Sequence, residues 1–196
     1  MKKLFLILMI AASILYSCNE RLGIGKNISN SNYTFINQDS LDVKLDTIIQ
    51  NKITLIGYIY THCPDICPMT THNLYLAEQK LKAEGINNVQ FILVSFDPER
   101  DTPSVLKDFA RVRELDLRKW VLLTGESKVV NRFNIMMGVK AIPADSTYTE
   151  DGMLNYYIIH TDRITLVDQK GRVRSEYKGS TVDPQLIFED VKYLGD

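Results

Sequence analysis

The chain has 196 residues, of which 45% are hydrophobic and 24% charged, and its formal net charge is −1. This length is enough for one domain with a substantial core, and the composition is ordinary for a globular protein. The balanced charge and the lack of a long basic stretch argue against nucleic acid as a partner.

The first residues have the pattern of a bacterial targeting signal. Lys2 and Lys3 precede an apolar run at residues 4–16, which is shorter than the about 20 residues needed to span a bilayer. The run ends Leu15-Tyr16-Ser17-Cys18, which resembles a lipobox with cleavage before Cys18 and a lipid on its sulfur. A plain signal peptide or a short uncleaved anchor is the alternative.

This signal predicts a domain organisation and a compartment. We expect a lipoprotein signal peptide at residues 1–17, a polar tether at 18–32 and one folded domain at 33–196. The domain would then work outside the cytoplasm, on the periplasmic face of a bacterial membrane, held there by the lipid on Cys18. Disulfides can persist in such a compartment.

Residues 33–36 and 41–45 alternate like two short strands joined by a turn, and they predict an N-terminal hairpin. Residues 53–60 form a β-branched and aromatic run that predicts a buried strand, with Tyr58 and Tyr60 expected in the core. The pattern breaks at Thr61, and a helical pattern follows at residues 64–82.

Two cysteines stand at the start of this helical pattern. Pro64 suits the first helical position, which would place Cys63 at the N-cap and Cys67 one turn below it on the same face. Four residues rise about 6 Å along a helix, within the roughly 4.4–6.8 Å between the Cα atoms of a disulfide. A helix start also favours thiolates. The pair is therefore a redox couple or half of a soft-metal site, and two unrelated buried cysteines are the alternative.

The remaining elements alternate along the chain. We expect strands at 89–95, 120–123, 156–159, 164–167 and 173–177, helices at 103–115, 127–136 and 184–193, and a polar loop at 144–153. Thr102 and Pro103 are an N-cap and first-turn pair, and the turn at 168–171 predicts a hairpin. This order predicts an α/β fold, with a central mixed sheet and helices on both faces.

Three motifs together resemble one known family. The Cys-Pro-Asp-Ile-Cys-Pro helix start, the stretch Asp97-Pro-Glu-Arg-Asp-Thr-Pro103 after the next strand, and the lone His160 before a late strand are similar to the Sco/SenC family. The resemblance covers about residues 33–194. It implies a thioredoxin-like fold, a copper-binding protein and a role in assembling the copper centre of cytochrome c oxidase.

The resemblance also implies the copper ligands, which carry over onto Cys63, Cys67 and His160. Two thiolates and an imidazole suit Cu(I), whereas Cu(II) favours more hard donors. His62 adjoins Cys63 and is poorly placed for the same ion, and His72 lies more than two helical turns beyond that cysteine. On sequence alone, His160 is as easily a core or surface histidine as a ligand.

Asp97, Arg100 and Asp101 follow the carboxyl end of a predicted strand, the edge at which open α/β sheets place their sites. Arg100 can pair with either carboxylate, so we expect these residues to support the loop. A solvated turn capped at Thr102 explains them equally well.

Three functions follow from these features. The first is a monomeric copper metallochaperone for a copper-containing oxidase subunit or another extracytoplasmic copper protein, which would bind Cu(I) and also accept Cu(II). The second is a thiol–disulfide oxidoreductase that reduces the cysteines of a copper-site partner, which does not need His160. A peroxidase of the peroxiredoxin kind ranks last, because no Pro-x-x-x-Thr-x-x-Cys pattern leads to Cys63.

Overall fold

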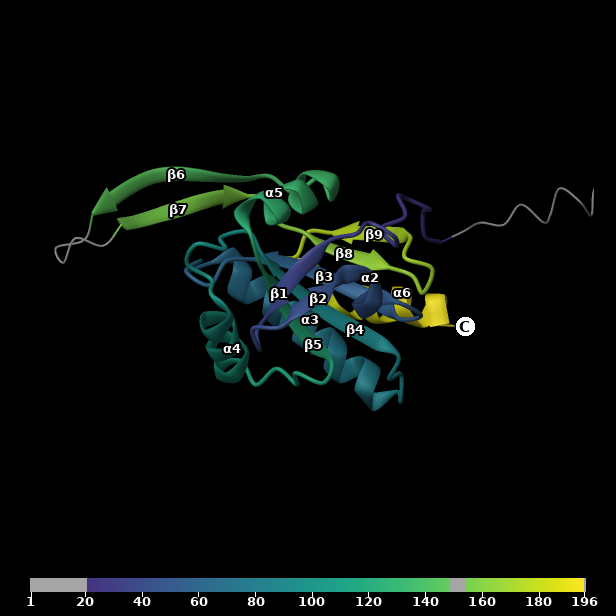
Figure 1. Ribbon diagram of the computed structural model, residues 1–196. Coiled ribbons are helices and arrows are strands. Elements are labelled where there is room, and N and C mark those ends of the chain that lie inside the picture. Colours follow the sequence, from purple (N-terminus) through teal and green to yellow (C-terminus); the bar gives the residue numbers. More distant parts are fainter. Residues whose placement is uncertain (1–20, 149–153, 196) are drawn as a thin grey trace, which may run out of the picture.

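A seven-stranded mixed sheet forms the centre of the structure, a computed structural model that describes residues 21–148 and 154–195 (Figure 1). Its strands are β1 (Thr34–Asn37), β2 (Asp42–Lys44), β3 (Ile53–Ile59), β4 (Val89–Ser95), β5 (Trp120–Thr124), β8 (Ile164–Val167) and β9 (Val173–Tyr177). A separate two-stranded sheet contains β6 (Ala141–Tyr148) and β7 (Leu154–His160). The helices are α2 (Leu45–Ile49), α3 (Ile66–Ala83), α4 (Pro103–Val112), α5 (Ser127–Met136) and α6 (Pro184–Gly195).

The strands of the large sheet lie in the order β2-β1-β5-β4-β3-β8-β9. β3, β4 and β5 are parallel and are connected through α3 and α4, while β1 and β8 run antiparallel to their neighbours β5 and β3. β1 and β2 form the expected N-terminal hairpin, and β8 and β9 form the late one. The predicted fold class, a thioredoxin-like mixed sheet flanked by helices, is confirmed.

Helices cover both faces of this sheet, as the interior strand β3 shows. Gly57 faces α3 so closely that an added Cβ would lie 3.0 Å from Leu74. The next residue, Tyr58, points to the other face, where its ring is 6.4 Å from Phe133 of α5. α6 packs beside α3. Successive side chains of a strand point to opposite faces, so β3 is buried on both.

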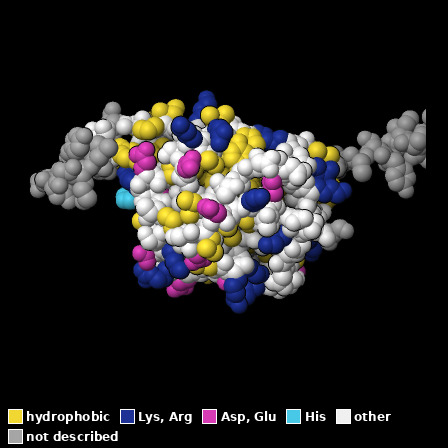
Figure 2. All heavy atoms as spheres, viewed as in Figure 1, with side chains coloured by type: hydrophobic (Ala, Val, Ile, Leu, Met, Phe, Trp, Pro, Cys, Tyr) yellow, Lys and Arg dark blue, Asp and Glu magenta, His cyan; other side chains and the backbone are white. Residues whose placement is uncertain are grey.

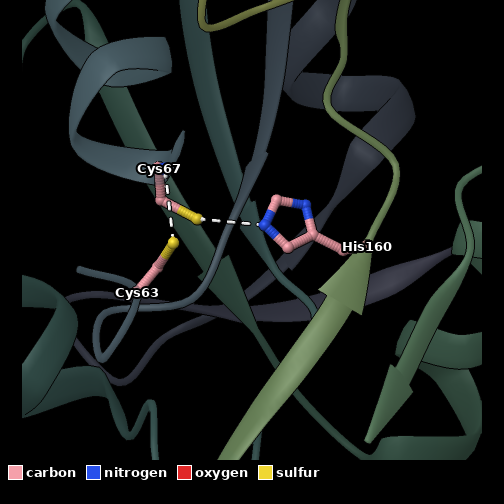
Figure 3. A group of neighbouring side chains, drawn as sticks. All are labelled: Cys63, Cys67 and His160. Atoms are coloured by element: carbon pink, nitrogen blue, oxygen red, sulfur yellow. Dashed lines mark hydrogen bonds between the residues drawn. The ribbon is translucent and has the colours of Figure 1, made fainter. Parts of the chain in front are cut away.

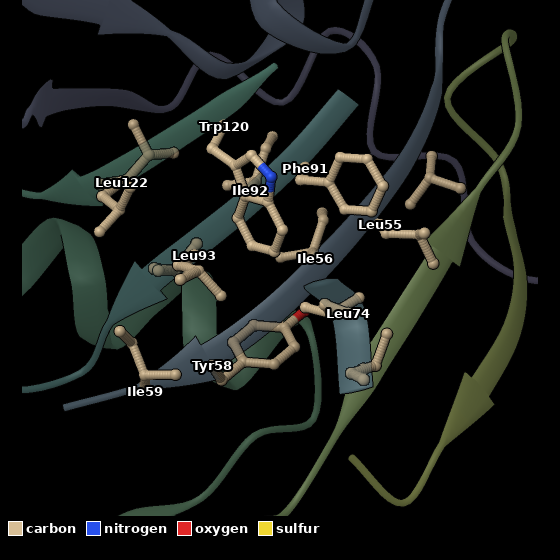
Figure 4. Packing of buried hydrophobic residues seen from close by; sticks show 14 of the residues in the cluster. Leu55, Ile56, Tyr58, Ile59, Leu74, Phe91, Ile92, Leu93, Trp120 and Leu122 are labelled. Carbon is tan, nitrogen blue, oxygen red and sulfur yellow. The ribbon is translucent and has the colours of Figure 1, made fainter. Parts of the chain in front are cut away.

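The core is continuous across the central strands, whose apolar side chains interlock over β3, β4 and β5 (Figure 4). Trp120 stacks on Phe91 at 4.7 Å, and its indole N–H donates to Glu78 of α3 at 2.7 Å. A buried indole with its N–H satisfied contributes its full apolar area to the core. The central strands therefore form a rigid base for the loops at their carboxyl ends.

Helix α3 begins later than the sequence pattern predicted. Its first residue is Ile66 and its N-cap is Asp65, so Cys63 precedes the helix and is not its N-cap. Pro68 explains the shift. In a helix starting at Pro64 its missing N–H would break an internal bond, whereas in the third position of α3 no intrahelical partner is required.

The prediction of a polar loop at residues 144–153 is also wrong in part. β6 extends through residues 144–148 and pairs antiparallel with β7, with a register shift between Pro143 and Ser146. A two-stranded sheet that projects from the body needs no alternating apolar pattern, so this strand had no signal in the sequence (Figure 1). The remainder of the expected loop, 149–153, lies outside the described residues.

Residues 25–28 of the expected tether bond to the start of β9 and to the turn before it. Gly25 donates its N–H to the Val173 carbonyl at 2.8 Å, and Ile28 donates to Gly171 at 2.7 Å. Ile28 is fully buried. The folded body therefore includes residues N-terminal to position 33. The predicted signal peptide and Cys18 lie outside the described residues.

On the face shown in Figure 2, basic, acidic and apolar side chains are interspersed, and charges of one sign do not gather in a patch. Within the described residues, none of the helices combines the length and the apolar character that a bilayer span requires.

Candidate metal centre

Two cysteines lie at the junction of β3 and α3. The chain turns after β3 with a bond from the Cys63 N–H to the Tyr60 carbonyl at 3.2 Å, and α3 begins at Ile66. Cys67 is fully buried in the first turn of α3, while Cys63 is 9% exposed in the loop before it. The N–H of Cys67 donates to Sγ of Cys63 at 3.5 Å. A free N–H at the helix start thus points at the first sulfur, as a thiolate there requires.

His160 reaches these cysteines from the end of β7, 93 positions after Cys67 (Figure 3). Its Nε2 lies 3.7 Å from Sγ of Cys67, and the ligand atoms of Cys63, Cys67 and His160 all lie within 4.8 Å of one another. Within the described residues, this is the one group of three His, Cys, Asp or Glu side chains close enough to share an ion.

The helix start does not lower the pKa of the Cys67 thiol as the sequence predicted. Burial raises the pKa of the Cys67 thiol, so this sulfur carries its proton when no metal is present. The ring Nδ1 of His160 lies 3.1 Å from the Thr161 carbonyl and can donate only in the tautomer with Nδ1–H. That tautomer leaves the lone pair of Nε2 facing Cys67, as metal-binding histidines require.

Asp101 holds the loop that leads to Cys63. Its buried carboxylate accepts the Thr61 N–H at 3.0 Å and the Thr61 hydroxyl at 2.5 Å. It also accepts the Ser95 hydroxyl at 2.6 Å, so it ties the ends of β3 and β4 together. Burial raises the pKa of Asp101, and these hydrogen bonds oppose that shift.

Asp97 and Arg100 form an ion pair at 2.5 Å, and this pair contacts β7. The Tyr156 hydroxyl donates to Asp97 at 2.6 Å, and the Arg100 guanidinium carbon lies 3.5 Å from the Tyr156 ring centroid. Burial and the bond to Asp97 raise the pKa of Tyr156 to about 12, so the phenol keeps its proton and donates. Of the two carboxylates open to Arg100 in the sequence, the structure selects Asp97.

The other two histidines are outside the cluster. His62 is exposed next to Cys63, with Nδ1 at 3.2 Å from the Thr61 hydroxyl. His72 is exposed on α3 and stacks on Tyr75, with 6.5 Å between the ring centroids.

The sequence reasoning missed the aromatic side chains around His160. The Phe96 ring lies 4.6 Å from the imidazole, and the Tyr60 ring lies 5.9 Å from it in an edge-on arrangement. Tyr156 lies four positions before His160 on the same strand. This spacing could have indicated that Tyr156 lies on the same face of the strand as His160, because residues i and i+4 of a strand share a face.

Comparison with protein-family models matches residues 23–195 to SCO1/SenC. The SCO1 protein homolog of Bacillus subtilis (strain 168) is 35% identical over 161 residues, which cover 82% of this chain and 79% of that protein.

Solved structures agree with this match. The copper-bound ScoI of Bradyrhizobium japonicum superposes with a TM-score of 0.69 at 27% identity, covering 88% of this chain and 99% of that one. A SCO1/SenC family lipoprotein of Bacillus anthracis gives 0.70 at 28% identity, covering 84% and 96%. BsSco, a member of the Sco family of cytochrome c oxidase assembly proteins in which a disulfide switch was identified, gives 0.67 at 32% identity, covering 88% and 96%.

Proposed function

The chain belongs to the SCO1/SenC family, and we propose from this premise that it binds copper and delivers it to a copper centre of cytochrome c oxidase. The observation that carries the proposal is the convergence of the Cys63, Cys67 and His160 donor atoms within 4.8 Å. The copper-bound structure of a 27% identical family member supports it.

The donors fit a soft monovalent ion. Thiolate and imidazole ligands lie about 2.0–2.3 Å from a metal such as zinc, so an ion at the centre of three donors needs them about 4 Å apart. The 3.7 Å between Cys67 and His160 is close to that spacing. Two sulfurs select Cu(I). Cu(II) is the second form that the site would take, with additional hard donors from outside the trio.

The position of the donors supports transfer. Half-buried His160 ends a strand of the projecting hairpin and is open to a partner, Cys63 keeps 9% of its surface exposed in the loop before α3, and Cys67 is fully buried. An incoming thiolate or imidazole of an acceptor protein can replace them one at a time. Closure of a Cys63–Cys67 disulfide would pass two electrons to an external oxidant. It would also remove both sulfur ligands and thereby free the copper.

A second candidate function is thiol–disulfide exchange with the cysteines of a copper-site partner. It is favoured by the two free, adjacent thiols and by the disulfide switch identified in BsSco. In this reaction the reduced pair would pass two electrons and two protons to the disulfide of the partner. His160 has no necessary part in it, so this histidine separates the two functions.

We further propose that Cys18 carries a lipid and holds the domain at the outer face of a bacterial membrane. Its sequence context and the similar lipoprotein of Bacillus anthracis support the anchor. The partner would then be a copper-containing oxidase subunit, or another copper protein, exposed on the same side. We expect the protein to act as a monomer.

A Cu(I) titration of the purified domain tests the proposed function. We expect the reduced protein to take up one Cu(I) against a competing chelator. The oxidised protein and a Cys63→Ser/Cys67→Ser variant should both fail to do so, whereas a His62→Ala variant should match the wild type. Equal copper retention by the double cysteine variant would remove the basis of the proposal.

A further inference from the structure

We propose that Tyr156 is a positioning residue for copper binding, because it anchors β7 to the loop after β4 and thereby sets where His160 lies. The inference rests on the proposed function, since it concerns the same site. It adds a residue that touches none of the three donor atoms.

Three contacts converge on Tyr156. Its hydroxyl donates to Asp97 at 2.6 Å, its ring lies 3.5 Å from the guanidinium carbon of Arg100, and its carbonyl accepts from Nη1 of Arg100 at 3.2 Å. The Asp97 carboxylate is buried, and it pairs with Arg100. We call Tyr156, Asp97 and Arg100 the β7 clasp. It joins side-chain and backbone atoms of β7 to one loop.

The clasp is needed because the main sheet does not hold β7. Among the described strands, β7 pairs with β6 and with none of the seven strands of the large sheet. An isolated two-stranded hairpin is marginally stable on its own. The position of His160 over the cysteines therefore depends on how the inner face of β7 rests on the body of the domain.

That inner face runs from the clasp to the metal site. Tyr156, Ile158 and His160 alternate along β7 and share one face. The N–H of Ile158 lies 3.5 Å from the Tyr60 hydroxyl, and the His160 ring packs on Phe96, the residue before Asp97. The clasp thus fixes one end of a short stretch whose other end presents the imidazole.

The neighbouring residue offers a matched control. Tyr157 is 53% exposed and points to the opposite face of β7 from Tyr156. Both Tyr→Phe substitutions remove one hydroxyl from adjacent positions of the same strand. Tyr156→Phe also keeps the ring that lies on Arg100, so it removes the bond to Asp97 alone.

The test compares Tyr156→Phe and Tyr157→Phe in a Cu(I) competition titration of the reduced protein. We expect Tyr156→Phe to weaken copper affinity about 10-fold, the lower end of the effect for groups that orient metal ligands. Tyr157→Phe should leave it unchanged. In the metal-free protein, the NMR signals of the His160 ring should shift or broaden in Tyr156→Phe and stay in place in Tyr157→Phe.

A second arm asks whether Tyr156 acts through His160. In a His160→Ala background, Tyr156→Phe should cost no further affinity. An equal loss in both backgrounds, or unchanged His160 signals, would overturn the inference. If the wild type binds no copper through its cysteines, the proposed function fails, and the metal-free NMR comparison still decides whether Tyr156 positions His160.

Discussion

The thiol of Cys67 and the Nε2 of His160 lie 3.7 Å apart, although 93 positions of sequence separate them. The cysteine comes from the first turn of α3, and the histidine comes from the end of a hairpin outside the main sheet. Because α3 holds the cysteine and the β6–β7 hairpin holds the histidine, His160 can leave the metal without unfolding of the core. This arrangement leads to the following predictions.

His160→Ala should weaken Cu(I) binding strongly and leave the Cys63–Cys67 disulfide potential nearly unchanged. The substitution removes one of three donors, but it leaves both sulfurs and the Cys67 N–H bond to Cys63 intact. Chelator competition and a glutathione redox titration measure the two quantities, with His72→Ala as the histidine control on α3. Unchanged copper affinity in His160→Ala would favour the oxidoreductase.

Copper binding should release protons and should strengthen as the pH rises above neutrality. Burial raises the pKa of Cys67, so the free protein holds this proton at pH 7, and a metal must displace it to reach the thiolate. At higher pH this displacement costs less free energy. Calorimetry in two buffers of different ionisation enthalpy should report at least about one proton per copper. Heats that are independent of the buffer would contradict the prediction.

Asp101→Ala should destabilise the domain by at least about 2 kcal/mol, because it leaves the Thr61 N–H and two hydroxyls without their buried acceptor. Urea unfolding of the metal-free protein measures this change. Asp108→Ala is the control, since this carboxylate is exposed on α4 and its removal should cost less than about 0.5 kcal/mol. Similar midpoints for the two variants would show that Asp101 does not hold the cysteine loop.

Gly57→Ala should cost about 1–3 kcal/mol, because the added methyl group would lie 2.9 Å from Leu93 and 3.0 Å from Leu74 in the core. The fully buried side chains of Leu93 and Leu74 would have to shift. Because Leu74 and Cys67 both lie in α3, copper affinity should fall as well. The control is Gly195→Ala, where the methyl group would meet only Ile53 at 3.9 Å among the described residues. Thermal unfolding and copper titration of both variants test the prediction.

Cys18→Ala should release the protein from the membrane fraction and shift its mass. The expectation comes from the short apolar run that ends at this cysteine. Fractionation and mass spectrometry of the variant beside Asn19→Ala give the answer. An unchanged membrane fraction in Cys18→Ala would mean that another segment holds the protein there.

The elements with local signals could be predicted from the amino-acid sequence alone. The strands β3, β4 and β5, the helix α5 and the hairpins β1–β2 and β8–β9 all follow from hydrophobic periodicity and turn residues within a few positions. The closeness of Cys63 and Cys67 at a strand-to-helix junction is equally local, because only three residues lie between them.

Contacts between distant segments of the chain became visible only in the folded structure. The bond of Tyr156 to Asp97, the choice of Asp97 over Asp101 as the partner of Arg100, and the bonding of residues 25–28 to residues 171–173 join stretches whose local patterns are independent. The meeting of His160 with Cys67 belongs with them, since residue patterns left this histidine open and a family resemblance was needed to select it. Periodicity reports which side of an element is buried, and it carries no information on which distant side chain will lie against it.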